Sequence, residues 1–349
     1  MRAKPGLLGF VAAVAFIASS AMSPVFAQDA GLKGISPAML AAAKKEGQLT
    51  LYAASQSDAV NALADGFRKA VPEIKVSVLR LATDALVTRF MSETDAGVFD
   101  ADVLNTYSAT VFDSRPEIWT RLDVAEIPAL AIWPKETIIG HYVNTGQTTL
   151  GLAANKNLVS PDLVPKTWPD MLRPEFKGKG MMIDPRVSII YMNWLNVMYE
   201  KYGEGFITRL RDQRFQIITG SVGGAVQQVA AGAMLIAIPP AWTHVNPYLE
   251  QGAPLAYNLP NENSDVMAIA SLSSWGIPKK SPHPNAAKVF LSWSLTEVPQ
   301  REQCKLTASA SFIVTDGKGC PQPFLPFVLA GAPLAQDRID KLTKLLDLK

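Results

Sequence analysis

The sequence has 349 residues, of which 48% are hydrophobic, and it carries 33 Lys and Arg against 31 Asp and Glu. Two of the basic residues and none of the acidic ones lie in residues 1–27, so the remainder is formally neutral. A neutral chain gives no electrostatic reason to expect nucleic acid or an anionic membrane surface as a partner. The length exceeds what one hydrophobic core usually holds, which predicts two lobes.

The N-terminus has the pattern of a secretory signal peptide. Arg2 and Lys4 precede an apolar run over residues 7–18, and small residues lead to Ala27. This pattern predicts a signal over residues 1–27, cleaved near Ala27. The run is short for a bilayer span, which disfavours the alternative of an uncleaved membrane anchor. No cysteine stands at the cleavage point, so we expect an exported chain that is free in the periplasm rather than lipid-anchored.

The two cysteines, Cys304 and Cys320, are sixteen positions apart. In an exported protein such a pair predicts a disulfide bond, which would stabilise the fold by about 3 kcal/mol on the chain-entropy model. Two free thiols are the alternative. A metal pair is disfavoured because no histidine lies nearby in the sequence.

The N-terminal half alternates predicted strands and helices. Strands are expected over residues 49–54, 74–78 and 101–104, with helices beginning near Ser55 and Thr83. This order predicts an α/β fold with a parallel sheet and crossover helices. Ligands of such sheets bind beyond the carboxyl ends of the strands. The candidate ligand-binding residues in those loops are Ser55, Gln56, Thr83, Tyr107 and Ser108.

A second α/β unit follows the Pro- and Lys-rich stretch 164–169. Its predicted strands cover residues 181–183, 215–218 and 235–238, and a long helix is expected over residues 189–202. Arg186 has the planar fork that suits a carboxylate or phosphate, and the alternative is a surface arginine paired with Asp184. The other candidate ligand-binding residues of this unit are Ser188, Ser221, Gly223, Gly224 and Trp242. Plain helix capping by the serines, a tight turn at the glycines and core packing of Trp242 are the alternatives.

An ordered set of motifs runs along the chain: EGQLTLY at 46–52, ETDAG at 93–97, ADV at 101–103, PKTWPDML at 165–172, FKGK at 176–179, DP at 184–185, HPNAAKVFL at 283–291 and Gln300. With these motifs in this order, the sequence resembles the ferric-type, family 1 extracellular solute-binding proteins of ABC importers. The resemblance implies a two-lobed type II periplasmic binding protein fold, a clamshell in which each lobe is a mixed sheet flanked by helices. Lobe one would comprise residues 28–150 and 276–349, and lobe two would comprise residues 151–265. Residues 266–275 would form the hinge strand through which the chain returns from lobe two to lobe one.

The resemblance also implies a function, namely capture of a small solute between the lobes and its delivery to an ABC permease and its ATPase. Iron-binding members hold the metal with two adjacent tyrosines, whereas this chain has Trp242 in that region and no Tyr-Tyr pair. We therefore expect an anionic organic solute, with no metal ligand and no cofactor. Binding of ferric iron or an iron chelate, and ligand sensing for a membrane histidine kinase, remain alternatives. We expect a monomer.

An enzyme is the least favoured class. The chain has three histidines, no pair of them at metal-ligand spacing, and no G-x-S-x-G elbow, because Thr219 stands where that motif needs its first glycine. No combination of nucleophile, base and orienting residue is evident from the sequence.

Overall fold

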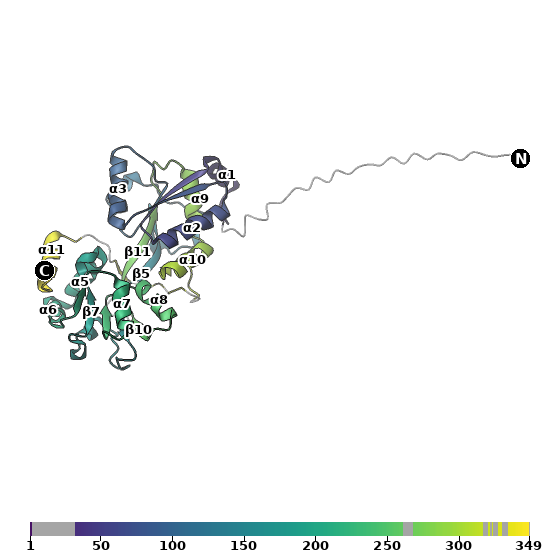
Figure 1. Ribbon diagram of the computed structural model, residues 1–349. Coiled ribbons are helices and arrows are strands. Elements are labelled where there is room, and N and C mark those ends of the chain that lie inside the picture. The colour runs from purple at the N-terminus through teal and green to yellow at the C-terminus, as the bar shows by residue number, and fades with distance from the viewer. Residues whose placement is uncertain are drawn as a thin grey trace.

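The chain is described here from a computed structural model (Figure 1). The structure describes Met1 and residues 32–260, 268–316, 320–321, 323, 327–329 and 334–348. The predicted signal peptide and its cleavage site near Ala27 lie outside these residues, as do residues 261–267, which include the first two of the predicted return hinge strand.

Two separate mixed β-sheets form the centres of two lobes (Figure 1). The eight-stranded sheet of lobe one has the order β12-β5-β11-β3-β1-β2, with β13 beside β11 and β4 beside β5. Its strands are β1 (Gln48–Ala53), β2 (Lys75–Arg80), β3 (Val103–Thr106), β4 (Ile138–Ile139), β5 (Tyr142–Thr149), β11 (Ala268–Gly276), β12 (Ala310–Ser311) and β13 (Phe327–Leu329). The five-stranded sheet of lobe two has the order β10-β6-β9-β7-β8. Its strands are β6 (Leu152–Asn155), β7 (Gly180–Ile183), β8 (Gln216–Ile218), β9 (Ile236–Ile238) and β10 (Leu255–Asn258).

Helices flank both sheets, which confirms the predicted α/β clamshell architecture. In lobe one they are α1 (Pro37–Glu46), α2 (Ser57–Ala70), α3 (Thr83–Asp95), α4 (Thr110–Asp113), α9 (Pro284–Ser294) and α10 (Glu297–Thr307). In lobe two they are α5 (Ile189–Tyr202), α6 (Glu204–Asp212), α7 (Val222–Ala230) and α8 (Trp242–Glu250). Short 3-10 helices occupy several connections: η2 (Pro116–Ile118), η3 (Pro128–Ile132), η4 (Lys135–Thr137), η5 (Trp168–Leu172), η6 (Pro174–Phe176) and η7 (Pro185–Val187).

The last helix, α11 (Gln336–Leu345), packs on lobe two rather than lobe one. It lies against α5 and α6 (Figure 1), where Leu342 and Leu346 are buried in the lobe-two core. The ion pair between Arg338 and Glu200 joins the same helices. The expectation that all of residues 276–349 belong to lobe one is therefore wrong for this helix. The sequence of this helix is amphipathic, which indicates that one face is buried but not which lobe buries it.

The chain passes between the lobes at the junction of β5 and β6. The expected lobe boundary lies between residues 150 and 151, and the structure places the passage at Leu150 and Gly151, since β6 already belongs to the second sheet. A Cβ on Gly151 would lie 2.5 Å from the ring of Tyr257, so only glycine fits this approach. The return passage leads into β11, which pairs antiparallel with β5 along most of its length.

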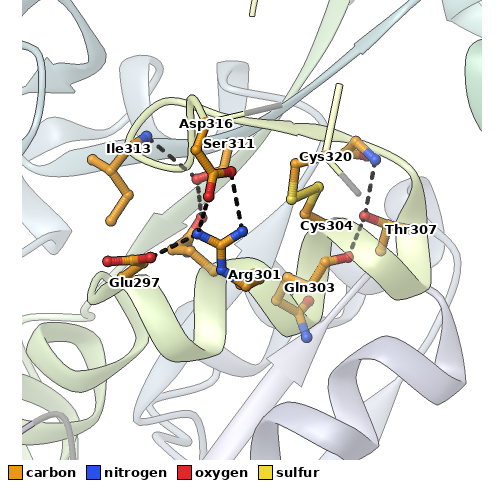
Figure 2. The surroundings of a disulfide bond; sticks show 11 residues. Glu297, Arg301, Gln303, Cys304, Thr307, Ser311, Ile313, Asp316 and Cys320 are labelled. Atoms are coloured by element: carbon orange, nitrogen blue, oxygen red, sulfur yellow. Dashed lines mark hydrogen bonds and ion pairs between the residues drawn. A yellow bond between two sulfur atoms is a disulfide. The ribbon is translucent and has the colours of Figure 1, made fainter. Parts of the chain in front are cut away.

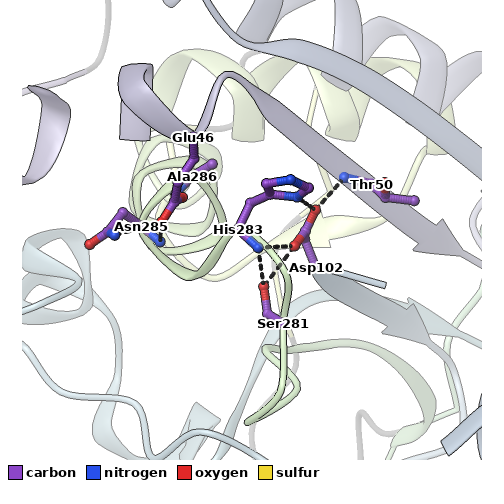
Figure 3. A network of polar contacts seen from close by, with 7 residues as sticks. All are labelled: Glu46, Thr50, Asp102, Ser281, His283, Asn285 and Ala286. Carbon is purple, nitrogen blue, oxygen red and sulfur yellow. Dashed lines mark hydrogen bonds and ion pairs between the residues drawn. The ribbon is translucent and has the colours of Figure 1, made fainter. Parts of the chain in front are cut away.

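A buried polar network fixes the segment before α9 to lobe one (Figure 3). The carboxylate of Asp102, which is fully buried, accepts hydrogen bonds from the Thr50 backbone N–H at 2.7 Å, the Ser281 hydroxyl at 2.7 Å and the His283 backbone N–H at 2.8 Å. Its second oxygen also lies 2.9 Å from Nδ1 of His283. The carboxylate of Glu46 accepts from the Ala286 N–H at 2.7 Å, so it caps the start of α9.

Candidate functional site

A cavity of about 230 Å³ lies between the two lobes. Lobe one contributes residues beyond β1 and β3, and lobe two contributes the first residues of α5 and α8. The rest of the lining comes from β5 and β11, which are the strands that lead between the lobes, from Leu150 after β5, and from Thr307 and Ser309 at the end of α10 and just after it. The lining residues are Ala54, Gln56, Tyr107, Thr148, Leu150, Ile190, Tyr191, Ala241, Thr243, His244, Ser271, Thr307 and Ser309. This is the position that the sheet topology predicts for a ligand.

Three helices from both lobes begin at this cavity. Gln56 is the N-cap residue of α2, Tyr191 lies in the first turn of α5, and Thr243 lies in the first turn of α8. The first N–H groups of a helix have no partners within the helix and carry partial positive charge. The described lining includes no Asp, Glu, Lys or Arg side chain. The fixed charge at this site therefore comes from helix termini, and it favours a negatively charged ligand.

The titratable side chains of the lining are held neutral. Burial raises the pKa of Tyr107 and of Tyr191 above the ordinary tyrosine value. Burial lowers the pKa of His244 below its ordinary value. Because Nδ1 of His244 accepts a hydrogen bond from the Ala241 N–H at 3.2 Å, the neutral ring carries its proton on Nε2. His244 is thus a hydrogen-bond donor in the wall of the cavity.

Two of the predicted ligand-binding residues, Gln56 and Tyr107, line the cavity. Ser55, one position away, is buried, and its hydroxyl donates to Oδ1 of Asn105 at 2.6 Å. This contact joins the ends of β1 and β3, so Ser55 does not cap α2, the helix expected to begin near it. Gln56 is the N-cap residue, and the helix begins at Ser57. Thr83, at the start of α3, and Ser108, whose N–H donates to the Thr106 hydroxyl, are half-buried outside this lining.

Arg186 is paired with Asp184, which was the alternative reading of its position. Its Nη2 lies 2.7 Å from Oδ2 of Asp184, and its Nε lies 3.0 Å from Oδ1. The guanidinium holds the pKa of Asp184 below the ordinary value. Asp184 is 1% exposed and Arg186 is 38% exposed, so the pair lies at the lobe surface and outside the cavity lining.

The remaining lobe-two candidates have structural contacts of their own. Ser188 caps α5 through the Ile190 N–H, and Ser221 caps α7 through the Gly224 N–H at 3.1 Å. Gly223 and Gly224 lie in the first helical turn, with ordinary space where a Cβ would stand, rather than in a tight turn. The ring of Trp242 packs on that of Tyr257 with centroids 5.3 Å apart. These five residues do not belong to the described cavity lining. A direct role for them in ligand binding stays a prediction.

Several lining residues were not selected from the sequence. They are Thr148, Tyr191, Thr243, His244, Ser271, Thr307 and Ser309. Tyr191, Thr243 and His244 lie in the first turns of α5 and α8, whereas most sequence-based candidates lay in the loops before helices. Thr148 and Ser271 lie on β5 and β11, and Thr307 and Ser309 lie at the end of α10 and just after it, in segments without a local motif. Only the tertiary arrangement of the two sheets brings them to the cavity.

A second cavity, of about 190 Å³, lies in lobe one at the opposite end of β3. Phe90, Ala101 and Lys280 are among its lining residues, and lobe two contributes none of the described lining. Because a clamshell binds its ligand between the lobes, the interlobe cavity is the candidate site.

The predicted disulfide bond between Cys304 and Cys320 is present (Figure 2). Cys304 lies on α10, next to the ion pairs that Arg301 forms with Glu297 and Asp316. Both cysteines are buried. The loop that the bond closes carries Thr307 and Ser309, so it includes part of the cavity wall.

The described part of the chain contains no cluster of three His, Cys, Asp or Glu side chains able to hold a metal ion. Nor does any helix within it have the length and apolar character needed to cross a membrane. The described lining of the interlobe cavity includes three side chains of a kind that can ligate a metal: the phenols of Tyr107 and Tyr191 and the imidazole of His244.

The comparisons with known proteins identify the family. The family of bacterial extracellular solute-binding proteins matches residues 62–316, so the chain belongs to that family. Its members bind small solutes for ABC importers and are binding proteins rather than enzymes. No curated protein sequence matches the chain.

Several solved structures share the fold of this chain. Iron-bound HitA from Pseudomonas aeruginosa is 20% identical, with a TM-score of 0.65 over 86% of this chain and 97% of that one. The Trichodesmium protein IdiA (FutA), in complex with iron and citrate, is 20% identical with a TM-score of 0.68 over 87% and 100%. AfuA from Actinobacillus pleuropneumoniae, with fructose-6-phosphate bound, is 18% identical with a TM-score of 0.61 over 87% and 99%. At these identities the likeness establishes the fold and not the ligand.

Proposed function

We propose that the protein captures a small anionic solute in the interlobe cavity and delivers it to an ABC permease. The observation that carries the proposal is the convergence of the starts of α2, α5 and α8 on a cavity whose described lining has no charged side chain. A carboxylate or phosphate in this position would meet N–H groups and neutral donors from both lobes. It would therefore bridge the lobes and favour the closed clamshell.

The anion preference expected from the sequence is kept, but different residues now support it. The sequence suggested Arg186 as the charge contact, and the structure pairs that side chain with Asp184. The donors that support the proposal are instead Gln56, Tyr107, Tyr191 and His244, together with the helix termini. Arg186 remains a candidate for contact with a ligand that extends beyond the cavity.

A calorimetric titration with matched probes tests the preference. The probes are fructose 6-phosphate and citrate as organic anions, inorganic phosphate as the smallest anion, and fructose as the neutral counterpart. We expect at least one anion to bind and fructose to bind at least a hundredfold more weakly, because it lacks the charged group that the helix termini favour. Equal affinity for fructose and fructose 6-phosphate, or no binding of any anion, would contradict the proposal.

Two substitutions on α5 locate the site. Tyr191 lines the cavity, whereas the hydroxyl of Tyr199 accepts a hydrogen bond from Nζ of Lys341 on α11. Loss of a hydrogen bond to a charged group costs about 1.5–3 kcal/mol, so Tyr191→Phe should weaken anion binding about ten- to hundredfold. Tyr199→Phe makes the same chemical change on the same helix and should leave the affinity unchanged. Equal effects of the two substitutions would place the ligand elsewhere.

Ferric iron or a ferric chelate is the second candidate, and a specific observation favours it. Tyr107 and Tyr191 come from opposite lobes and line the cavity with His244, and phenolate and imidazole are ligands that iron accepts. The raised pKa of both tyrosines opposes it, because phenolate coordination requires deprotonation. Addition of ferric citrate decides between them: direct coordination would give a visible phenolate-to-iron absorption band that Tyr191→Phe weakens. Binding of citrate without that band would favour the anion.

We further propose that the chain acts in the periplasm as a monomer, after removal of the signal peptide. The family is extracellular, which supports export, and the apolar run of residues 7–18 supports a cleaved signal. Mass spectrometry of the exported protein should give a mature N-terminus near residue 28, and size-exclusion chromatography with light scattering should give the mass of one chain. A ligand-sensing role remains the alternative, and loss of solute uptake on deletion of the gene would favour transport.

A further inference from the structure

Three hydroxyl side chains form a row across neighbouring strands in the wall of the interlobe cavity. Thr148 of β5 and Ser271 of β11 are direct partners in the antiparallel ladder. Ser309 immediately precedes β12, which pairs with the other edge of β5, and its hydroxyl lies 2.7 Å from that of Thr148. All three residues line the cavity. We call Ser309, Thr148 and Ser271 the hydroxyl row.

The hydroxyl row has more hydroxyl protons than its own hydrogen bond uses. Each hydroxyl carries one proton, and the bond between Thr148 and Ser309 uses only one of the pair's two. Ser271 brings a third, so two protons of the row are available to a ligand. Thr307, also in the lining, differs because its hydroxyl already donates to the Gln303 carbonyl oxygen and accepts from the Ser309 N–H. Thr307 therefore has no proton left for a ligand, whereas the row has two.

Ser271 gives an independent indication that a ligand completes the row. Its side chain is 4% exposed, and its Oγ has no hydrogen-bond partner among the residues that the structure describes. A buried hydroxyl without a partner costs about 1–3 kcal/mol, and such groups in native proteins call for an explanation. A ligand oxygen that enters the cavity would supply the missing partner.

We propose that the hydroxyl row is the subsite that receives the oxyanion of the solute, its two available donors binding two oxygens of a carboxylate or phosphate. This inference rests on the proposed anion-binding function and adds to it the residues that recognise the charged group. Thr148 and Ser271 belong to β5 and β11, the strands through which the chain connects the lobes, so the row positions the oxyanion at the hinge side of the cavity. The remainder of the solute then extends toward α2, α5 and α8, where closure of the lobes encloses it.

The test compares two serine substitutions on β11. Ser271→Ala removes a hydroxyl that has no described partner in the unliganded protein, so its thermal midpoint should not fall. Its affinity for the tightest-binding probe among fructose 6-phosphate, citrate and inorganic phosphate should fall about ten- to hundredfold. Ser274→Ala is the matched control, because that hydroxyl donates to Oδ1 of buried Asn144 at 2.7 Å and lies outside the cavity lining. It should lower the thermal midpoint and leave the affinity unchanged.

The outcomes separate the two proposals. If the wild-type protein binds a probe and Ser271→Ala binds it equally well, the subsite is wrong and the anion-binding function stands. If the wild-type protein binds none of the three anions, both are wrong. The three probes also distinguish the source of the oxyanion, since citrate offers only carboxylates and fructose 6-phosphate only a phosphate. An affinity loss accompanied by a lower midpoint in Ser271→Ala would mean that Ser271 supports the fold, which also contradicts the subsite.

Discussion

Replacement of Asp102 by asparagine should destabilise lobe one without changing ligand affinity. One carboxylate oxygen accepts from the Ser281 hydroxyl and the His283 N–H, and the other accepts from the Thr50 N–H and lies beside Nδ1 of His283 (Figure 3). An amide has only one acceptor oxygen. Whichever way it is turned, its NH2 group faces either the Thr50 or the His283 backbone N–H, and that N–H loses its acceptor.

The magnitude follows from these contacts. One orphaned buried N–H costs about 1–3 kcal/mol, and the remaining bonds lose the assistance of the negative charge. We expect Asp102→Asn to lower the free energy of unfolding by about 2–4 kcal/mol. With a slope of about 3 kcal/mol per molar urea, the unfolding midpoint should fall by about 1 M. Affinity should not change, because Asp102 lies before β3 whereas Tyr107 lines the cavity after it.

Urea unfolding followed by circular dichroism measures the change, and Asp100→Asn is the control. Asp100 is exposed two positions earlier, so the same substitution there should change the free energy of unfolding by less than about 0.5 kcal/mol. Equal midpoints for wild type and Asp102→Asn would refute the reasoning, since they would mean that the buried carboxylate is replaceable by an acceptor with half its capacity.

Three further predictions concern the disulfide bond, His244 and Arg186. Replacing Cys304 and Cys320 together by serine should lower the free energy of unfolding by about 3 kcal/mol, and an unchanged urea midpoint would contradict this. Because burial lowers the pKa of His244, the unfolded chain binds more protons below about pH 6.5, so stability should fall as the pH drops from 7.5 to 5. That fall should be smaller in His244→Asn, whose amide oxygen can replace Nδ1 as acceptor, and identical pH profiles would exclude His244 as a cause. Arg186→Ala should lower stability by about 1–2 kcal/mol, a value reduced for solvent screening, because it leaves the buried carboxylate of Asp184 without its cation; no change in the thermal midpoint would contradict this.

The sequence predicted the elements of the fold well because their patterns are local. The helix expected over residues 189–202 has the observed bounds of α5, and the alternation of strands and helices identified both sheets. The lobe assignment of α11 was wrong because its amphipathic stripe indicates burial without naming the partner surface. The architecture itself was accessible mainly through the ordered motifs that resemble the solute-binding family.

The site was predictable only in part. Gln56 and Tyr107 follow strands whose carboxyl ends face the other lobe, and the topological rule found them. Arg186 and Ser188 satisfied the same rule but are engaged in structural contacts. The Arg186 guanidinium binds the Asp184 carboxylate, and the Ser188 hydroxyl accepts a hydrogen bond from the Ile190 N–H at the start of α5. Ser271 could not be found, since its significance depends on the lack of a partner for its hydroxyl, and a sequence does not record that.

The central claim is that the two lobes close around a small anion when it binds. Small-angle X-ray scattering tests this claim most directly. The measurement compares the unliganded protein with protein saturated by the tightest-binding anion, and fructose at the same concentration is the neutral control. Because the ligand would contact α2 in lobe one and both α5 and α8 in lobe two, the account predicts a smaller radius of gyration with the anion and no change with fructose. An unchanged radius at proven saturation would contradict capture between the lobes.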